Sequence, residues 1–329
     1  MNGEKAAMSV EEKMRVAVVT DPRRASVREV PVPRPGAGQV LVQLEGCGVC
    51  GSNLPLWEGR PWFNYPAAPG NPGHEGWGRV VEVGSEVSNL CVGERVAFLS
   101  ERAFAEYDVA NENALVKLPG SLDGMDVPGE PLGCVMNIWR RSQIKSGQRV
   151  AVVGVGFLGA LLIRLANKAG AEVVAVSRRP YSLELARQMG ASRALPIDDP
   201  STTSAIWEWS GGGGCERVIE AVGLQQTLDV ATNLCGIRGR LIIAGFHQDG
   251  NRQVDLQLWN WRGLDVVNAH ERDPQAYVEG MRAAVDAMVS GELEVKSLIT
   301  HRVPLSRSAT AFELLRTRPR GFVKAVVVP

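Results

Sequence analysis

The stretch that decides the fold is Arg149-Val-Ala-Val-Val153 followed by Gly154-Val-Gly156-Phe-Leu-Gly159. A short apolar strand, a glycine turn and a helix start together form a phosphate-binding turn. Gly154 permits the tight turn, Gly156 lets the backbone approach a pyrophosphate, and Gly159 leaves room for the helix to pack on the strand. The motif is weak when it stands alone, but its position between a strand and a helix predicts a dinucleotide site. The expected cofactor-binding residues are Gly154, Gly156, Phe157, Leu158 and Gly159.

Strand and helix patterns alternate around this turn. A helix is expected at Leu158–Lys168, a strand at Glu172–Ser177 and a helix at Leu183–Met189, and further strands at Arg217–Glu220 and Arg240–Ala244. Such alternation is typical of a parallel sheet with helices on both faces. We therefore predict a Rossmann-type, doubly wound α/β domain over residues 131–268.

The residues after the second strand indicate which dinucleotide is bound. Sites specific for NAD usually carry Asp or Glu about 20 residues after the turn, where it accepts the ribose hydroxyls. This chain has Ser177, Arg178 and Arg179 there. A hydroxyl and two guanidinium groups can donate hydrogen bonds to a 2′-phosphate, which an acidic group would repel. The sequence therefore favours NADP over NAD.

Composition excludes several classes of protein. The 36 basic and 36 acidic residues cancel, so neither nucleic acid nor an anionic membrane surface is an expected partner. The charged N-terminal tail lacks the apolar core of a signal peptide, and no apolar run is long enough to span a membrane. We expect a cytoplasmic protein with free cysteines, because its six cysteines are scattered.

Four residues ahead of the glycine turn are potential metal ligands: Cys50, His74, Glu75 and Glu130. Catalytic zinc takes three protein ligands of the N, S or O type and leaves one position for water or substrate. Cys47 and Cys50 form a Cys-x-x-Cys pair, but neither a closed structural zinc site nor a redox dithiol fits the surrounding sequence. Cys47 is expected to pack in the core.

Four blocks carry a resemblance to a known family. They are Gly48-Val-Cys50-Gly-Ser52-Asn53, Gly73-His74-Glu75-Gly-Trp-Gly78, Glu130-Pro-Leu132 and the glycine turn. In this order they resemble the zinc-dependent medium-chain alcohol dehydrogenases, over residues 14–329. The Glu130-Pro pair is similar to the sorbitol and threonine dehydrogenase branch.

The resemblance implies a GroES-like, mainly β catalytic domain built from residues 1–130 and 269–329, with the Rossmann domain inserted between them. It also implies that Cys50 and His74 bind zinc and that Glu75 or Glu130 supplies the third oxygen, directly or through the metal water. Ser52 would pass the alcohol proton onward, and Glu75 would take part in catalysis.

Three departures from the family pattern change these expectations. Asn53 replaces the usual Asp, so support for a ligating histidine is expected to be weaker. Pro55 stands near the place of a relay histidine. The four-cysteine lobe that holds a structural zinc is missing, because residues 98–104 are only a short connection. We expect one catalytic zinc and no structural zinc.

The resulting hypothesis is a zinc-dependent alcohol or polyol dehydrogenase that acts on a small alcohol or ketone. Aromatic residues between Leu56 and Pro66 could line its pocket, and Asn268 and His270 could lie beside it. Two alternatives stay open: a zinc-free quinone or enoyl reductase of the same fold, and a dinucleotide-binding regulator without turnover. An apolar segment, Val254 to Val267, favours a homodimer or homotetramer.

Overall fold

The computed structural model describes residues 11–329, and most of the charged N-terminal tail lies outside the described residues. The chain divides into two compact units. Unit 1 contains the chain up to Gly133, together with Asp273–Val289 and Val295–Pro329, and unit 2 contains Cys134–Arg272 and Ser290–Glu294. The change from one unit to the other lies inside helix α2 (Gly129–Ser142).

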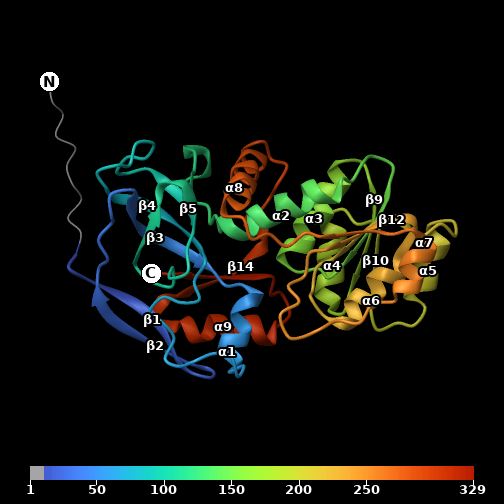
Figure 1. Ribbon diagram of the computed structural model, residues 1–329, viewed down its shortest axis with the longest axis horizontal. Coiled ribbons are helices and arrows are strands. Elements are labelled where there is room, and N and C mark those ends of the chain that lie inside the picture. The colour runs from blue at the N-terminus through green and yellow to red at the C-terminus, as the bar shows by residue number, and fades with distance from the viewer. Residues whose placement is uncertain (1–10) are drawn as a thin grey trace. The chain divides into compact units, whose positions relative to one another are not determined.

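Unit 1 is mainly β (Figure 1). Its strands are β1 (Lys13–Asp21), β2 (Arg24–Pro31), β3 (Gln39–Gly48), β4 (Glu75–Val83), β5 (Arg95–Leu99), β6 (Tyr107–Asn111), β7 (Leu115–Lys117), β14 (Ile299–Pro304) and β15 (Lys324–Val328). Its helices are α1 (Leu54–Glu58), α8 (Pro274–Val289) and α9 (Ser308–Thr317).

Strand β3 organises the larger sheet of unit 1. The strand order is β14-β15-β3-β4-β5-β7, with β6 also paired to β3, while β1 and β2 form a separate pair. The run Val40–Val42 is fully buried, because β3 has neighbours on both edges and core on its faces. The register sets Gly48, at the end of β3, opposite Glu75 of β4 and Val326 of β15. The C-terminal strand β15 therefore lies beside the N-terminal strand β3 at Gly48, on the edge opposite β4.

Unit 2 alternates strands and helices along the chain. It contains β8 (Arg149–Val153), α3 (Phe157–Lys168), β9 (Glu172–Ser177), α4 (Pro180–Gln188), β10 (Arg193–Pro196), α5 (Thr202–Trp209), β11 (Cys215–Glu220), α6 (Gln225–Leu234), β12 (Cys235–Ile243), α7 (Leu256–Arg262) and β13 (Asp265–Asn268). All six strands are parallel, in the order β10-β9-β8-β11-β12-β13.

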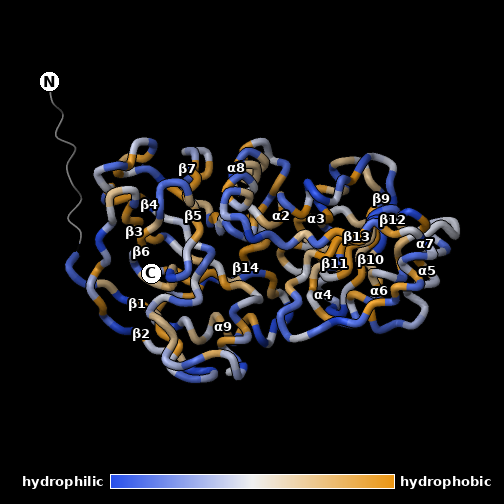
Figure 2. The backbone as a smooth tube through the Cα atoms, viewed as in Figure 1, coloured by the Kyte–Doolittle hydropathy of each residue, from blue (hydrophilic) through white to orange (hydrophobic). Residues whose placement is uncertain are grey.

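This order explains where unit 2 can bind a ligand. The chain runs outward from β8 to β9 and β10, and then returns to β11 on the other side of β8. Parallel sheets bind ligands at such a reversal, beyond the carboxyl ends of the strands. The central strands β8 and β9 are buried apolar runs, and the tube in Figure 2 is largely orange in this sheet. The carboxyl ends of β8 and β11 therefore mark the expected ligand edge.

The predicted fold class is confirmed, since a mainly β unit from both ends of the chain accompanies a parallel α/β unit. The sequence does not predict β2, because its apolar residues Ala25, Val27 and Val30 are few and only partly buried, and most of the strand is exposed. Helices α7 and α9 are also not predicted from the sequence; α7 has only 7 residues and buries none of them.

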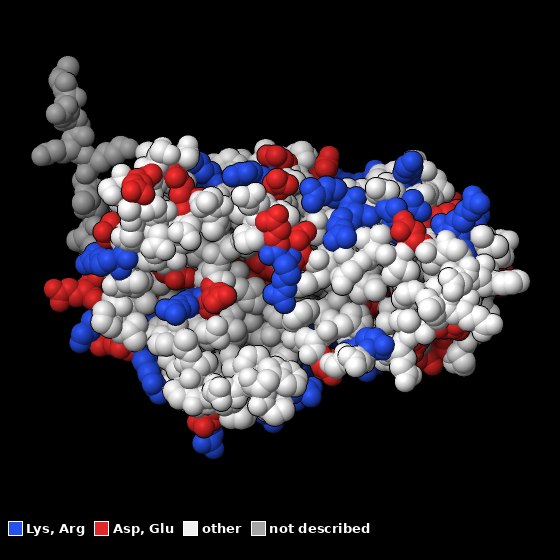
Figure 3. Space-filling model, in the orientation of Figure 1, with Lys and Arg blue, Asp and Glu red and all other residues white. Residues whose placement is uncertain are grey.

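The surface carries charges of both signs. Lys and Arg side chains lie among Asp and Glu side chains on the face drawn in Figure 3, and the two kinds are equal in number in the whole sequence, 36 each. Among the described residues, none of the helices has the length and apolar character needed to cross a membrane.

Candidate metal centre and cofactor turn

Three predicted ligands meet in unit 1. Cys50 lies two residues after the end of β3, His74 directly precedes β4 and Glu75 begins it, and β4 is the antiparallel neighbour of β3. One ligand atom from each of Cys50, His74 and Glu75 lies within 4.8 Å of the others. A thiolate, an imidazole and a carboxylate are the donor types that zinc takes.

The carboxylate of Glu75 is completely buried. Gly48 leaves the space that it occupies, and Lys324 donates a hydrogen bond to it. A Cβ atom at Gly48 would lie 1.7 Å from Glu75 Oε2, so only glycine leaves room for this carboxylate. Lys324 Nζ donates a hydrogen bond to Glu75 Oε1 at 2.6 Å. Oε2 lies 2.5 Å from the same ammonium group without hydrogen-bond geometry, and it has no hydrogen-bond partner among the described residues. A buried carboxylate oxygen that has an ion pair but accepts no hydrogen bond still has a lone pair available for a metal ion.

The ring of His74 is oriented by a backbone carbonyl. Its Nδ1 lies 2.9 Å from Pro72 O, which can only accept, so Nδ1 carries the hydrogen and Nε2 has the free lone pair. Burial lowers the pKa of His74, but the contact with Cys50 and the charges of Cys50, Glu130 and Glu75 outweigh it and raise the pKa to about 10. The anionic groups around this imidazole therefore favour a positive charge at Nε2, either a proton or a metal ion.

Asn53 contacts the candidate metal centre through backbone groups rather than through the ring of His74. Its Oδ1 accepts a hydrogen bond from Cys50 N at 2.9 Å, and its Nδ2 donates to Pro72 O at 3.1 Å. Pro72 O is also the acceptor for His74. Asn53 thus connects the segments that carry the candidate ligands Cys50 and His74, through neutral hydrogen bonds.

The other two predicted residues lie differently. Ser52 Oγ is 3.5 Å from His74 Nε2, and the side chain is partly exposed. Glu130 is in the first turn of α2 and does not belong to the group within 4.8 Å. Its negative charge nevertheless raises the pKa values of both His74 and Lys324. The charge of Glu130 therefore acts on His74 and Lys324, although Glu130 is outside the group of three.

Lys324 is a site residue that sequence reasoning missed. Burial lowers its pKa, but the charges of Glu75, Cys50 and Glu130 outweigh burial, and the pKa is raised above its ordinary value. A signal was available, since Lys324 is the one charged residue within Gly321-Phe-Val-Lys-Ala-Val-Val-Val328. A charge inside an otherwise apolar strand needs a buried partner.

The aromatic segment before His74 is partly core. Trp57 is 1% exposed, stacks on Phe312 with ring centroids 5.0 Å apart, and donates from Nε1 to Glu313. The suggestion that Trp57 lines a pocket is wrong, because its ring fills the space between α1 and α9. Trp62 differs, since 54% of it is exposed.

The glycine turn of unit 2 has the geometry that its sequence predicts. Gly154 has φ of +104°, which disfavours other residues. A Cβ atom at Gly159 would lie 2.0 Å from Gly154 O, while a Cβ at Gly156 would meet nothing within 4 Å. The space in front of Gly156 is therefore open, and Phe157 and Leu158 begin the 12-residue helix α3 behind it. An anion could approach these backbone N–H groups.

The residues predicted to distinguish the dinucleotides lie at the same edge. Ser177 ends β9, which is the direct neighbour of β8, and its side chain is buried. Arg178 is exposed and Arg179 precedes the first turn of α4. The three residues therefore follow the strand next to the glycine turn.

Comparison with known proteins agrees with this arrangement. Residues 36–125 match the family profile "Alcohol dehydrogenase GroES-like domain", and residues 158–286 match "Zinc-binding dehydrogenase". Sorbitol dehydrogenase of Ovis aries is 28% identical, with 90% of this chain and 91% of that protein covered. Erythritol/L-threitol dehydrogenase of Mycolicibacterium smegmatis is also 28% identical, with coverage of 97% and 99%.

A solved structure from Sinorhizobium meliloti, described as a zinc-binding dehydrogenase bound to NADP, is 28% identical and superposes with a TM-score of 0.81. The alignment covers 97% of this chain and 100% of that chain. Sequence blocks, fold and relatives agree. The chain therefore belongs to the zinc-dependent medium-chain dehydrogenases of the sorbitol and threonine dehydrogenase branch, oxidoreductases that act on CH–OH groups.

Proposed function

We propose that the chain is a zinc-dependent dehydrogenase that transfers a hydride between a secondary alcohol or ketone, of polyol, sugar or amino-alcohol type, and a nicotinamide dinucleotide, with NADP preferred. One observation carries the proposal. Cys50, His74 and Glu75 converge within 4.8 Å, and a buried oxygen of Glu75 has no hydrogen-bond partner among the described residues. Relatives named for sorbitol and for erythritol or threitol support the substrate class.

The proposed ligands are Cys50, His74 and Glu75, with Glu130 as the alternative third ligand, directly or through water. Glu75 is favoured because its carboxylate is already in the group of three. The proposal includes one zinc per chain. Cys47, Cys215 and Cys235 are buried, and burial raises the pKa of each thiol, to about 12 for the latter two. This opposes the thiolate form that a second zinc would need.

When bound, zinc would act as a Lewis acid on the substrate oxygen and the nicotinamide would exchange a hydride with the carbinol carbon. The chain's own residues prepare this reaction. Ser52 Oγ, 3.5 Å from His74 Nε2, is positioned to take the alcohol proton and pass it toward solvent. Lys324 holds the carboxylate of Glu75 in place. Overall, the alcohol loses a hydride to the dinucleotide and a proton to water.

The proposed preference for NADP rests on Ser177, Arg178 and Arg179. They follow β9, beside the glycine turn, and the described residues 177–179 include no carboxylate that would repel a 2′-phosphate. The related structure from Sinorhizobium meliloti is bound to NADP, which supports this choice.

Two other functions are compatible with this fold. A zinc-free quinone or enoyl reductase would have no need for a converging thiol, imidazole and carboxylate. A regulator without turnover would bind the dinucleotide and catalyse nothing. A preparation that holds zinc and oxidises an alcohol would exclude both.

We also propose that the chain forms a homodimer or homotetramer through β13 and α7. Strand β13 is an edge of the parallel sheet, and Trp261 and Leu256 of α7 are 87% and 59% exposed. A second copy would cover these side chains and pair with the free strand edge. Light scattering of the purified chain measures the mass, and a monomer would contradict this assembly.

The test of the proposed function combines metal analysis with a substrate panel. Zinc measured by mass spectrometry should be about one per chain, and Cys50→Ala and His74→Ala should remove it. Cys91→Ala is the matched control, because Cys91 is exposed and outside the group. Polyols, sugars and ketones are then assayed with both dinucleotides. Two zinc ions per chain, or full activity without metal, would contradict the proposal.

A further inference from the structure

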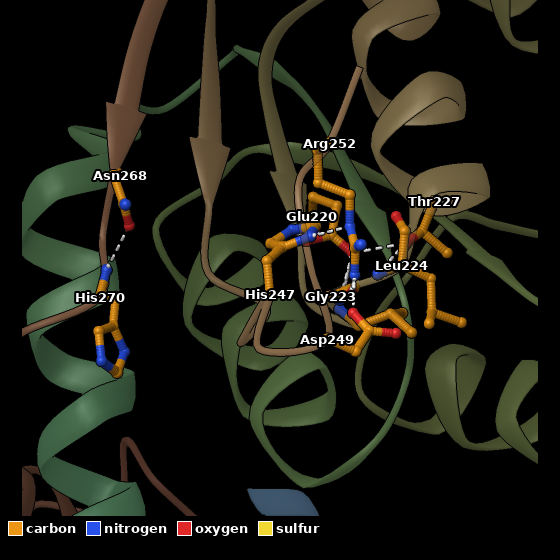
Figure 4. Close-up of polar contacts among 10 residues, drawn as sticks. Glu220, Gly223, Leu224, Thr227, His247, Asp249, Arg252, Asn268 and His270 are labelled. Atoms are coloured by element: carbon orange, nitrogen blue, oxygen red, sulfur yellow. Dashed lines mark hydrogen bonds and ion pairs between the residues drawn. The ribbon is translucent and has the colours of Figure 1, made fainter. Parts of the chain in front are cut away.

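Unit 2 contains a buried carboxylate that the proposed mechanism does not use. Glu220 ends β11 and is 0% exposed. Its Oε1 accepts hydrogen bonds from Val222 N at 2.9 Å, Gly223 N at 2.8 Å and Thr227 Oγ1 at 2.7 Å. Its Oε2 lies 3.0 Å from His247 Nε2 (Figure 4). A buried charge is tolerated when donors satisfy it in this way.

The contacts of His247 define its tautomer. Arg252 Nε lies 2.9 Å from His247 Nδ1, and a guanidinium group can only donate. Nδ1 must therefore accept, and a neutral ring then carries its hydrogen on Nε2, where it donates to Glu220. We call Glu220, His247 and Arg252 the triad. In the triad, the neutral ring of His247 accepts a hydrogen bond from the Arg252 guanidinium group and donates one to the Glu220 carboxylate.

The triad fastens the segment after β12 to the turn after β11. Arg252 Nη2 donates to Gly223 O at 2.8 Å and also pairs with Asp249. A Cβ atom at Gly245 would lie 2.2 Å from Gly223 N, so the two segments are in direct backbone contact. Both segments lie beyond the carboxyl ends of their strands.

A second connection lies beside the triad. Gln225 Nε2 donates to Gln253 O at 2.8 Å, and Gln253 N donates to Gln225 Oε1 at 2.9 Å. The segment 245–253 is thus held against residues 221–225 at several points. Surface loops are usually more mobile than the strands that they connect. These hydrogen bonds therefore restrict the motion of segment 245–253.

The fastened segments expose large apolar side chains at the ligand edge. Val222 is 39% exposed, Leu224 45% and Phe246 40%. A Cβ atom at Gly154 would lie 2.3 Å from Val222 Cγ2, so this wall starts directly beside the glycine turn. Phe246 stacks on His270, with ring centroids 5.1 Å apart, which extends the wall to the end of β13. Apolar surfaces with a few fixed polar groups are typical of cofactor sites.

We propose that the triad is a positioning device for the nicotinamide half of the dinucleotide: His247 and Arg252 hold Val222, Leu224 and Phe246 as the wall that this half contacts. The inference rests on the proposed function, since it assumes that a dinucleotide lies on the glycine turn. The adenosine half would lie toward Ser177–Arg179, because β9 and β11 are on opposite sides of β8. The triad therefore affects one half of the cofactor.

The test compares whole dinucleotides with fragments that lack nicotinamide. Titration calorimetry of the full chain measures the dissociation constants of NADPH and NADH, and of 2′-phospho-ADP-ribose and ADP-ribose. In His247→Leu, binding of the preferred dinucleotide should weaken by about tenfold or more, while binding of the matching fragment stays within about twofold. His247→Gln should restore most of the loss, because its amide can donate to Glu220 and accept from Arg252.

Arg262→Leu is the matched control. Arg262 donates to the carbonyls of Thr232 and Asn233 in the last turn of α6 and of Cys235 at the amino end of β12, away from the ligand edge. The Arg262→Leu variant should have a lower melting temperature and unchanged dinucleotide binding. Arg252→Lys keeps the charge without the planar fork, and provides the same comparison as His247→Leu if that variant does not fold.

Two results would overturn the inference alone. One is wild-type affinity for the dinucleotide in both His247→Leu and Arg252→Lys, and the other is equal weakening of dinucleotide and fragment, which would indicate a merely structural role. A wild-type chain that binds neither NADPH nor NADH would instead contradict the proposed function, and the inference would fail with it.

Discussion

Lys324 Nζ donates to Glu75 Oε1 at 2.6 Å, although 249 residues separate the two positions in the chain. Both side chains are almost fully buried, 6% and 0% exposed. Strand β3 brings them together, because β15 pairs with it on one edge and β4 on the other. The proposed third zinc ligand therefore has a cation of its own before any metal binds.

Lys324→Met should destabilise the zinc-free chain far more than the zinc-loaded chain. Loss of one partner of a buried ion pair costs about 3–5 kcal/mol, because the remaining charge is left unpaired. Bound zinc would supply the missing positive charge to Glu75. Thermal unfolding with and without zinc measures the two losses, and equal losses would contradict a role of Glu75 at the metal.

Gly48→Ala should reduce zinc occupancy. The new Cβ atom would lie 1.7 Å from Glu75 Oε2, so the carboxylate has to move away from Cys50 and His74. Gly51→Ala is the matched control, because a Cβ at Gly51 would meet nothing within 4 Å. Zinc content after dialysis is the measurement. Full occupancy in Gly48→Ala would show that zinc does not depend on this position of Glu75.

Glu130→Gln and Glu75→Gln distinguish the two proposed oxygen ligands. If Glu75 binds the metal, its variant should lose zinc, because an amide oxygen is a poorer ligand than a carboxylate. The Glu130 variant should keep zinc and shift the pH dependence of turnover, since its charge acts on His74 and Lys324. The reverse pattern of zinc loss would assign the third ligand to Glu130.

The double variant Arg178→Ala/Arg179→Ala should weaken NADPH binding much more than NADH binding. Hydrogen bonds to a charged group contribute about 1.5–3 kcal/mol, which corresponds to roughly ten- to hundredfold. Ser177→Asp should move the preference toward NAD. Arg193→Ala, at the start of β10, is the control. Quenching of tryptophan fluorescence measures both affinities, and equal wild-type affinities would contradict the proposed preference.

Glu313→Gln should remove part of the acid sensitivity of unit 1. Hydrogen bonds from Arg316, Arg23 and Trp57 lower the pKa of Glu313 from 4.5 to about 2. A lowered pKa contributes stability that is fully present above pH 4.5 and is lost as the pH falls toward 2. Urea unfolding at pH 6 and pH 3 should therefore show a smaller stability difference between wild type and variant at pH 3. A constant difference would contradict this account; Glu172→Gln, at an exposed position, is the control.

The sequence by itself determined the features that depend on neighbours in the chain. The glycine turn between β8 and α3 could be predicted because its chemistry is local: a tight turn, a close approach and a helix start follow each other within 11 residues, Arg149 to Gly159. Cys50, His74 and Glu75 also indicated a metal centre, because thiolate, imidazole and carboxylate groups are the donors that zinc takes.

Only the tertiary structure decided which distant groups complete these sites. Lys324 meets Glu75, and Arg252 reaches Glu220 through His247, because strand register and loop contacts bring them together. Trp57, by contrast, is buried against Phe312 rather than exposed to a pocket. A sequence pattern shows whether a side chain is apolar or charged. Its partner depends on strand register and loop contacts, which bring together residues far apart in the chain.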